Sequence, residues 1–214
     1  DSLGANTTAS YNTALGHTAL LSNTTGAFNT ANGFQALRNN TTGTSNTSVG
    51  ESALYANTTG GDNSALGNGA LGANTTGSHN VAIGDRSLLS NTTAAYNTAV
   101  GDRSLRYNTT GAENTALGQN ALAANTTGAE NTAVGKGALD ANTTANNNTA
   151  VGRNALTTNT TGPYNTAVGD DALGLHTTGA NNVCIGKDAG KWGTDAIATG
   201  SDNTLIGNYI YATS

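Results

Sequence analysis

The stretch Asn97-Thr98-Ala99-Val100-Gly101, followed by Ser104-Leu105 and Asn108-Thr109-Thr110-Gly111, is one copy of a unit that recurs along almost the whole chain. The glycine that closes its first motif returns every 17 residues from Gly16 to Gly186, and a last copy follows at Gly207. A short fixed period is typical of proteins in which each unit stacks on the next, because no unit buries its apolar face alone. The repeat therefore predicts one elongated domain.

The composition indicates an ordered chain with a narrow core. Among 214 residues, charged side chains make up 10 % and the net charge is −5, whereas disorder usually combines low hydrophobicity with high net charge. The few bulky apolar residues are also strictly placed. Because the sequence holds no basic patch, nucleic acid and acidic membranes are poor candidate partners.

Three further features of the sequence limit the alternatives. No apolar run approaches the roughly 20 residues of a membrane span, so we expect no direct membrane insertion of this segment. Cys184 is the single cysteine, which excludes an intrachain disulfide. The chain begins in mid-repeat, since Asp1-Ser2-Leu3 matches Arg103-Ser104-Leu105, and we expect it to be a mature or excised piece of a longer protein.

Each unit predicts two short strands and two turns. Side chains of a strand alternate between its faces, so Thr98 and Val100 share one face and Ala99 lies on the other. The Val100 position is aliphatic in nearly every copy and the Thr98 position becomes valine in two, so we predict that both point inward. Leu105 marks a second inward row. The recurring glycine predicts a positive φ or close packing at structural turns, represented by Gly16, Gly50, Gly84, Gly101, Gly135 and Gly169.

Short, regularly spaced strands are stable when each pairs in register with the same strand of the next unit. The sequence thus predicts an all-β fold, a parallel β-solenoid of about twelve 17-residue coils, with a rise of ~4.8 Å per coil. A helix is disfavoured, because it would contain a turn-forming Asn-Thr-Thr-Gly in every unit. Stacked asparagines are expected to form amide ladders, as in Asn23-Asn40-Asn57-Asn74 and Asn12-Asn29-Asn46-Asn63.

The Ala99 position is small in almost every copy although the alternation predicts that it faces outward. A free surface would vary, so an outward row of small residues indicates a second chain lying against it. The alternative is that alanine merely fits a crowded pleat. We interpret this row as a candidate subunit interface made of Ala14, Ala31, Ala65, Ala82, Ala99, Ala116, Ala133, Ala150 and Ala167.

At these residues the chain resembles a known family. Asn80-Val81-Ala82-Ile83-Gly84 is similar to the head repeats of YadA-like trimeric autotransporter adhesins, and Asn-Thr-Ala-Val-Gly followed by Asn-Thr-Thr-Gly resembles repeats of phage tail-fibre-like proteins. The resemblance covers residues 3 to about 190. It implies a left-handed parallel β-roll, a homotrimer of chains side by side, and an extracellular place on a bacterial cell surface or virion. Adhesin heads usually have a shorter repeat, so the extra residues imply a longer turn or a third side.

The pattern changes after Gly186. Gly190 replaces the expected leucine, no Asn-Thr-Thr-Gly follows, and four residues are gained before the last glycine. We therefore divide the chain into a repeat solenoid, 1–186, and an irregular last coil with a cap or connector, 187–214. Terminal repeats are atypical because they cover the open end of a stack, so Trp192 is interpreted as an end cap, with a binding aromatic as the alternative.

No catalytic residues, metal ligands or cofactors are predicted, because histidines and carboxylates fall at unrelated repeat positions. We expect a non-enzymatic adhesin or tail-fibre segment that presents a binding surface to an extracellular ligand. Receptor contacts are assigned to aromatic residues at variable positions, namely Phe28, Phe34, Tyr96, Tyr107 and Tyr164. Two alternatives stay open: a self-assembling filament subunit and an ice-binding solenoid. The second is weakened because adjacent Thr109 and Thr110 leave one outward threonine row.

Overall fold

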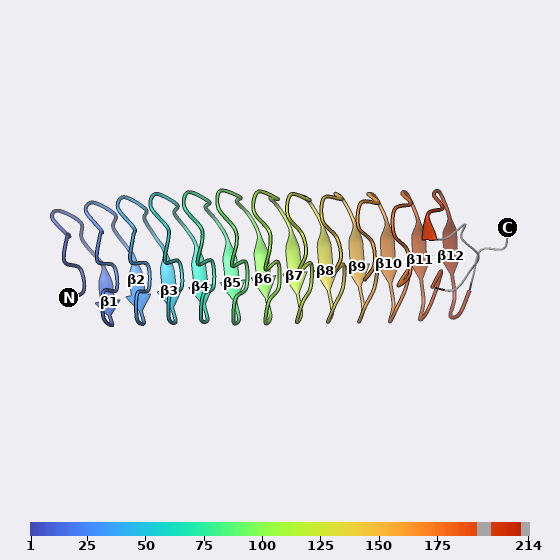
Figure 1. The fold of residues 1–214 in the computed structure, drawn as a ribbon, viewed down its shortest axis with the longest axis horizontal. Helices are drawn as coiled ribbons and strands as arrows, with labels where there is room; N and C mark the ends of the chain where they lie inside the picture. Colours follow the sequence, from blue (N-terminus) through green and yellow to red (C-terminus); the bar gives the residue numbers. More distant parts are fainter. Residues whose placement is uncertain (192–197, 211–214) are drawn as a thin grey trace.

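The computed structural model describes residues 1–191 and 198–210 and shows a rod built of stacked coils (Figure 1). In the described residues one strand of three residues comes from each coil, so the prediction of two strands per unit is wrong; the row marked by Leu105 lies in a turn instead. The strands are β1 (Thr13–Leu15), β2 (Thr30–Asn32), β3 (Thr47–Val49), β4 (Ser64–Leu66), β5 (Val81–Ile83), β6 (Thr98–Val100), β7 (Thr115–Leu117), β8 (Thr132–Val134), β9 (Thr149–Val151), β10 (Thr166–Val168), β11 (Val183–Ile185) and β12 (Thr204–Ile206).

All twelve strands form one parallel sheet in chain order, with like residues above like residues. Between β5 and β6, for example, Ala82 lies opposite Ala99 and Ile83 lies opposite Val100. The register also survives the longer last step, because Thr204 of β12 lies opposite Val183 of β11. The predicted β-solenoid is thus confirmed, and its sheet continues across the predicted domain boundary at residue 186.

The predicted orientation of the strands is wrong. The alanine row, represented by Ala99, is completely buried inside the coil, while the Thr98 and Val100 rows lie on the outer face of the sheet. Ser48, which belongs to the alanine row, shows how thin the interior is: its Oγ donates to the carbonyl oxygen of Ala53 in the same coil at 2.8 Å. Strands β1 to β11 place alanine, serine or cysteine in this narrow interior, and Leu205 takes the same row in β12 at the end of the stack.

The core therefore consists of the small strand residues and the leucine row, represented by Leu105, which is fully buried in coil after coil. Each of these leucines has a left-handed backbone, with φ of 48° at Leu105. Such a conformation costs on the order of 1–3 kcal/mol in a non-glycine residue and persists only where its surroundings fix it. Here the Leu105 N–H donates to the Ala121 carbonyl of the next coil at 2.9 Å, so stacking holds the turn.

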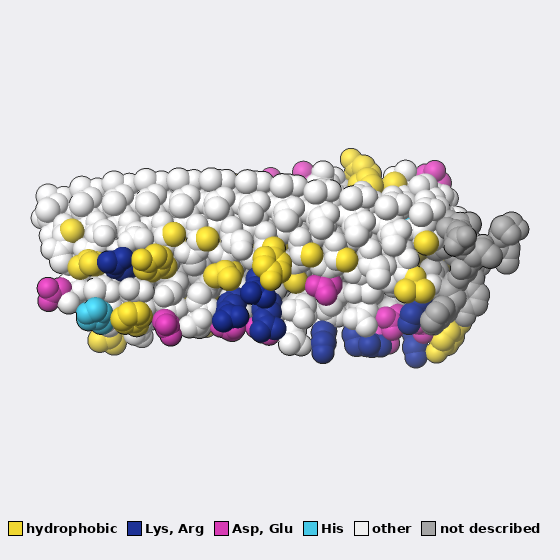
Figure 2. Space-filling model, in the orientation of Figure 1, with side chains coloured by type: hydrophobic (Ala, Val, Ile, Leu, Met, Phe, Trp, Pro, Cys, Tyr) yellow, Lys and Arg dark blue, Asp and Glu magenta, His cyan; other side chains and the backbone are white. Residues whose placement is uncertain are grey.

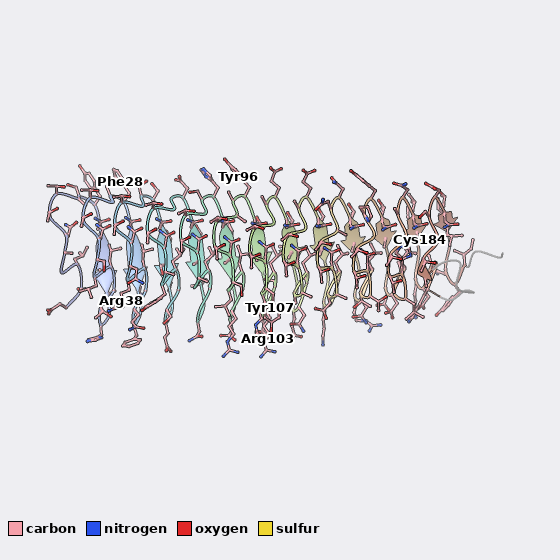
Figure 3. The ribbon with its side chains drawn as sticks, turned by 45° about the horizontal axis from the view of Figure 1, so that its top comes forward. Phe28, Arg38, Tyr96, Arg103, Tyr107 and Cys184 are labelled. Atoms are coloured by element: carbon pink, nitrogen blue, oxygen red, sulfur yellow. The ribbon has the colours of Figure 1, made fainter. Side chains whose placement is uncertain are left out.

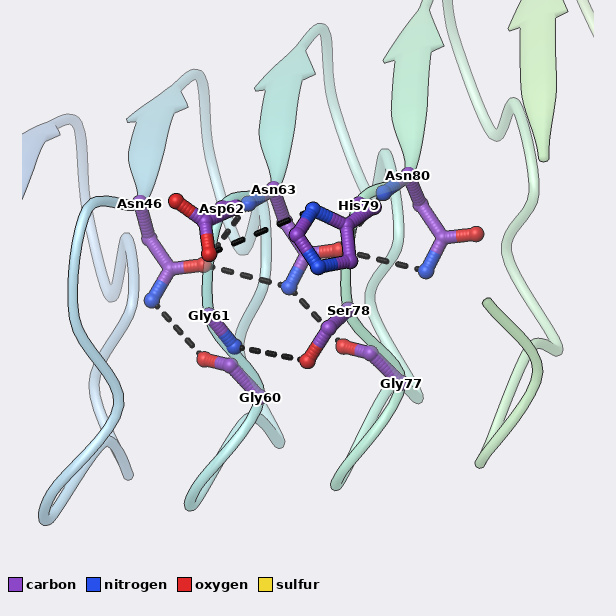
Figure 4. Close-up of polar contacts among 9 residues, drawn as sticks. All are labelled: Asn46, Gly60, Gly61, Asp62, Asn63, Gly77, Ser78, His79 and Asn80. Carbon is purple, nitrogen blue, oxygen red and sulfur yellow. Dashed lines mark hydrogen bonds and ion pairs between the residues drawn. The ribbon is translucent and has the colours of Figure 1, made fainter. Parts of the chain in front are cut away.

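Two asparagine ladders run along the rod, one of them ending at Asn159 before His176, and confirm the predicted amide stacking. In one ladder, Asn63 Nδ2 donates to Asn46 Oδ1 at 3.1 Å and to the Gly77 carbonyl at 2.9 Å (Figure 4). In the other, Asn108 Nδ2 donates to Asn91 Oδ1 at 3.1 Å and to the Gly111 carbonyl at 2.8 Å. Both amide protons are used, so these buried polar side chains are satisfied without water.

The glycine that follows each strand has both properties predicted for it. Gly101 has a φ of +130°, and an added Cβ would lie 2.6 Å from the carbonyl oxygen of Gly118 in the next coil. Gly111 at the second turn has no positive φ, and alanine takes the same place at Ala94 and Ala145. The first turn thus requires glycine for its backbone conformation, whereas the second turn also accepts alanine.

Candidate functional site

The outer surface of the sheet, here called the sheet face, carries two parallel rows of side chains. The threonine row is Thr13, Thr30, Thr47, Ser64, Val81, Thr98, Thr115, Thr132, Thr149, Thr166, Val183 and Thr204. The aliphatic row is Leu15, Asn32, Val49, Leu66, Ile83, Val100, Leu117, Val134, Val151, Val168, Ile185 and Ile206. Its larger members are well exposed, with Leu66 at 48 % and Ile83 at 38 % of their full accessibility. The sheet face is therefore a long, narrow, uncharged strip of methyl and hydroxyl groups.

The prediction that the alanine row forms a subunit interface is wrong, because the row lies inside the coil. Its nine alanines are Ala14, Ala31, Ala65, Ala82, Ala99, Ala116, Ala133, Ala150 and Ala167. All of them belong to the row inside the coil; Ala14, in the first strand, is partly buried and the other eight are buried. They cannot contact another chain, because their side chains pack within their own coils. The rows that a second chain would meet are the threonine and aliphatic rows on either side of them.

The aromatic residues predicted to contact a receptor are all exposed, but the structure does not bring them into one patch. Phe28, Tyr96 and Tyr164 occupy the same place in three different coils, whereas Phe34 and Tyr107 belong to two other rows. Figure 3 shows Phe28 and Tyr96 along one edge of the rod and Tyr107 toward the opposite edge. They are separate features rather than a single site.

Stacking in register also pairs rings that sequence reasoning treated singly. Tyr11 and Phe28 stack with ring centroids 4.9 Å apart, and His79 stacks on Tyr96 at the same distance. The rings are nearly parallel, at 9° and 8°. The signal that would have found these pairs is simple, since each pair is separated by 17 residues. Equivalent positions in adjacent coils therefore hold rings at stacking distance.

Charged side chains form one compact network near the end of the described repeats. Lys191 Nζ lies 3.2 Å from Asp171 Oδ2 and 3.1 Å from Asp188 Oδ1. Arg153 Nε lies 2.9 Å from Asp170 Oδ1. Hydrogen bonding to Asp188 raises the pKa of Lys191, and hydrogen bonding to Asp170 raises the pKa of Arg153. These ion pairs join adjacent coils, so we interpret the network as structural. In Figure 2 Lys and Arg side chains gather along the lower edge of the rod.

Other chemical groups are few. Cys184 takes an alanine-row place in β11, and burial raises the pKa of its thiol to about 11. Across residues 1–191 and 198–210 no cluster of three histidine, cysteine or acidic side chains is placed to hold a metal ion, and no helix is long and apolar enough to span a membrane. Trp192, the predicted end cap, lies outside the described residues.

Comparison with known proteins adds no relative. No family model, no curated protein and no solved structure matches this chain. The functional argument therefore rests on the geometry of the rod.

Proposed function

We propose that this chain is a non-enzymatic segment of an extracellular trimeric fibre, a bacterial surface adhesin or a phage tail fibre, in which the solenoid is a rigid shaft. The observation that supports this most is the sheet face. Its aliphatic row exposes Leu66, Ile83 and Leu117 in the isolated chain, in line with one another along the rod. Burying apolar surface contributes roughly 25 cal/mol per Å², so a continuous apolar strip favours association.

The dimensions of the sheet face suggest how chains would associate. Twelve strands at ~4.8 Å and three residues at ~3.3 Å give a strip of roughly 55 by 10 Å, or about 550 Å². A stable pairwise interface usually buries about 800 Å² on each partner. Three chains meeting around one axis let each sheet face, with the turn that follows each strand, contact two neighbours, which increases the area buried per chain. Closed cyclic symmetry also ends the association at a defined size.

Such an assembly would leave the turn rows outside. Phe28, Tyr96 and Tyr164 do not belong to the strands, so they remain available in a trimer packed through the sheet face. We propose that receptor contacts use these variable rows, with the shaft supplying rigidity and spacing. The partner is an extracellular surface or ligand, and no catalytic step is required.

The assembly is tested by sedimentation velocity on the wild type and on the double variant Val134→Asn, Val151→Asn. Asparagine already stands in the aliphatic row at Asn32, so an amide there is compatible with the coil. We expect a wild-type trimer and a shift of the double variant toward monomer, with an unchanged far-UV circular dichroism spectrum. The matched control is Thr110→Asn, Thr127→Asn in an exposed row away from the sheet, which should leave the trimer intact. A monomeric wild type, or a double variant that stays trimeric, would contradict the proposal.

One observation favours ice binding as a second candidate. The threonine row lies on the sheet face beside the aliphatic row, so hydroxyl and methyl groups form a flat array with a spacing of ~4.8 Å along the rod. Sequence reasoning counted an outward threonine row only at the turn and missed this one. A monomeric wild type that inhibits ice recrystallisation, and loses that activity in the Val134→Asn, Val151→Asn variant, would assign the sheet face to ice. Rods longer than one chain in electron micrographs would instead support the filament.

A further inference from the structure

A surface groove of about 500 Å³ lies across the coils that contain β2 to β5. Its volume falls within the roughly 300–1,000 Å³ range of small-molecule sites. We call it the Tyr55 groove. Its lining consists of Gln35, Ser52, Tyr55, Ala56, Gly69, Gly72, Ala73, Leu89 and Ser90.

The groove exists because one coil lacks side chains where its neighbours have them. Tyr55, Gly72 and Leu89 occupy equivalent positions in three successive coils, 17 residues apart. Gly72 therefore leaves a rung without a side chain of its own, here called the empty rung, between a tyrosine and a leucine that are two coil steps, roughly 9.6 Å, apart. Leu89 borders it, since Leu89 Cδ1 would lie 3.2 Å from a Cβ added at Gly72. Gly69 widens the space, because the same coil also lacks a side chain in the neighbouring row.

Ring pairs elsewhere in the rod show that an aromatic ring occupies the height of one coil. Tyr11 and Phe28, and likewise His79 and Tyr96, hold rings from adjacent coils with centroids 4.9 Å apart. A ring placed at the level of Gly72 would lie one coil step from Tyr55, at the distance over which the chain stacks its own rings. The empty rung thus has the thickness of a single six-membered ring.

Tyr55 is held in place to receive such a ring. Arg38 Nη1 donates to the Tyr55 hydroxyl at 3.0 Å, and the Arg38 guanidinium carbon lies 5.8 Å from the ring centroid. Arg38 precedes Tyr55 by one coil, whereas Gly72 follows it, so the side of the ring toward Gly72 has no side chain from the equivalent position. Arg38 is labelled in Figure 3, near the same edge of the rod as Tyr107.

Apart from the tyrosine, the polar side chains that line the groove are neutral and have no hydrogen-bond partner within the described protein. Within the described part of the chain, the side chains of Gln35, Ser52 and Ser90 make no hydrogen bond to the protein, whereas Ser87 Oγ nearby donates to the Gly84 carbonyl at 3.1 Å. None of the lining residues carries a charge at neutral pH. An apolar ring wall with a few neutral donors and acceptors complements a ring that has C–H groups on its face and hydroxyl groups at its edge.

We propose that the Tyr55 groove binds one neutral pyranose ring of a glycan, stacked on Tyr55 at the level of Gly72 and hydrogen-bonded by Gln35, Ser52 and Ser90. This inference adds a ligand class to the proposed fibre but does not depend on its assembly. The groove lies outside the strands of the sheet face, so a monomeric rod would have the same site.

The test uses the methyl glycosides of glucose, galactose, mannose and N-acetylglucosamine as probes in saturation-transfer difference NMR, with titration of the strongest. We expect saturation of ring protons for at least one probe. Gly72→Leu should fill the empty rung and weaken binding at least tenfold. Leucine already occupies this row at Leu21 and Leu89, and Gly72 has no positive φ. The new Cβ would lie 3.1 Å from the Gly69 carbonyl oxygen and 3.2 Å from Leu89 Cδ1, so both neighbours must shift by a few tenths of an ångström. Tyr55→Leu should cause a similar loss by removing the stacking wall.

The matched control is Gly174→Leu, which makes the same substitution in the same row six coils further on. It should bind as the wild type does, and circular dichroism should show equal folding of all variants. The proposal is overturned if no methyl glycoside binds, if Gly72→Leu binds undiminished, or if Gly174→Leu loses as much affinity. A signal from phenol but from none of the sugars would assign the groove to an aromatic side chain of a partner instead. Each of these outcomes is independent of the sedimentation result, which tests the trimer alone.

Discussion

Asn97 and Asn114, one coil apart, are joined by two hydrogen bonds inside the rod. Asn97 Oδ1 accepts from the backbone N–H of Asn114 at 3.0 Å and from its Nδ2 at 3.3 Å. Asn114 Nδ2 also donates to the Gly128 carbonyl at 2.8 Å, so a single side chain closes a turn of its own coil and joins that coil to the preceding one. The rod is therefore held by repeated polar contacts between coils as much as by its thin apolar core.

The first prediction concerns that ladder. Asn114→Leu should remove Oδ1, which accepts the buried backbone N–H of Asn131, and leave that N–H stranded at a cost of about 1–3 kcal/mol. It also removes one of two donors from Asn97 Oδ1 and from the Gly128 carbonyl. We expect a clear fall in the urea midpoint followed by circular dichroism. Gln119→Ala, at an exposed position of the same coil, is the control and should leave the midpoint nearly unchanged. Equal midpoints for the two variants would show that the ladder does not stabilise the rod.

The second prediction compares the two glycine turns. Gly101→Ala places a Cβ 2.6 Å from the Gly118 carbonyl at a φ of +130°, so both space and backbone conformation oppose it. Gly111→Ala meets crowding without the unfavourable φ, and the chain itself uses alanine there at Ala94. Gly101→Ala should therefore lower the thermal midpoint far more than Gly111→Ala. The reverse order would remove the conformational argument for the first turn.

These contrasts show what the sequence can and cannot predict. The 17-residue period predicts the stack because register alone aligns like residues, and buried asparagines are predictable because few side chains hydrogen-bond their own copies. Apolarity could not predict which face of the strand points inward, since Ala99 and Val100 are both apolar. A strand of three residues is also too short for an alternating pattern to decide. Only the narrow interior, seen in the Ser48 contact with Ala53, decides between them. The Tyr55 groove was missed because it arises from the absence of a side chain at Gly72, and the repeat pattern points to residues that are present rather than absent.

The third prediction concerns the one ladder position held by histidine. His176 follows Asn159 in its row, and Asn159 Oδ1 is buried without a hydrogen-bond partner in the described structure. His176→Asn should supply an Nδ2 donor at the place where each preceding coil of this row has one. We expect a gain of about 1 kcal/mol in the free energy of unfolding, measured by chemical denaturation. Asn159→Ala in the wild-type background should cost less than Asn142→Ala, because its ladder is already incomplete on that side. A loss of stability in His176→Asn would mean that the histidine is the better residue there.

The last prediction links Cys184 to the pH dependence of stability. Burial raises the pKa of its thiol from 9.0 to about 11, so the folded chain keeps a proton that the unfolded chain releases between these values. The thiol's contribution to stability is therefore fully present below pH 9 and falls as the pH rises toward 11, by roughly 1.4 kcal/mol per pH unit. Cys184→Ala should remove this part of the slope, because alanine, which fills the same row in β10 at Ala167, does not titrate. Urea denaturation of both proteins at pH 8 and pH 10 measures the difference, and lysine and tyrosine titration cancels between them. Parallel pH profiles for wild type and Cys184→Ala would show that the thiol is not protected by burial in β11.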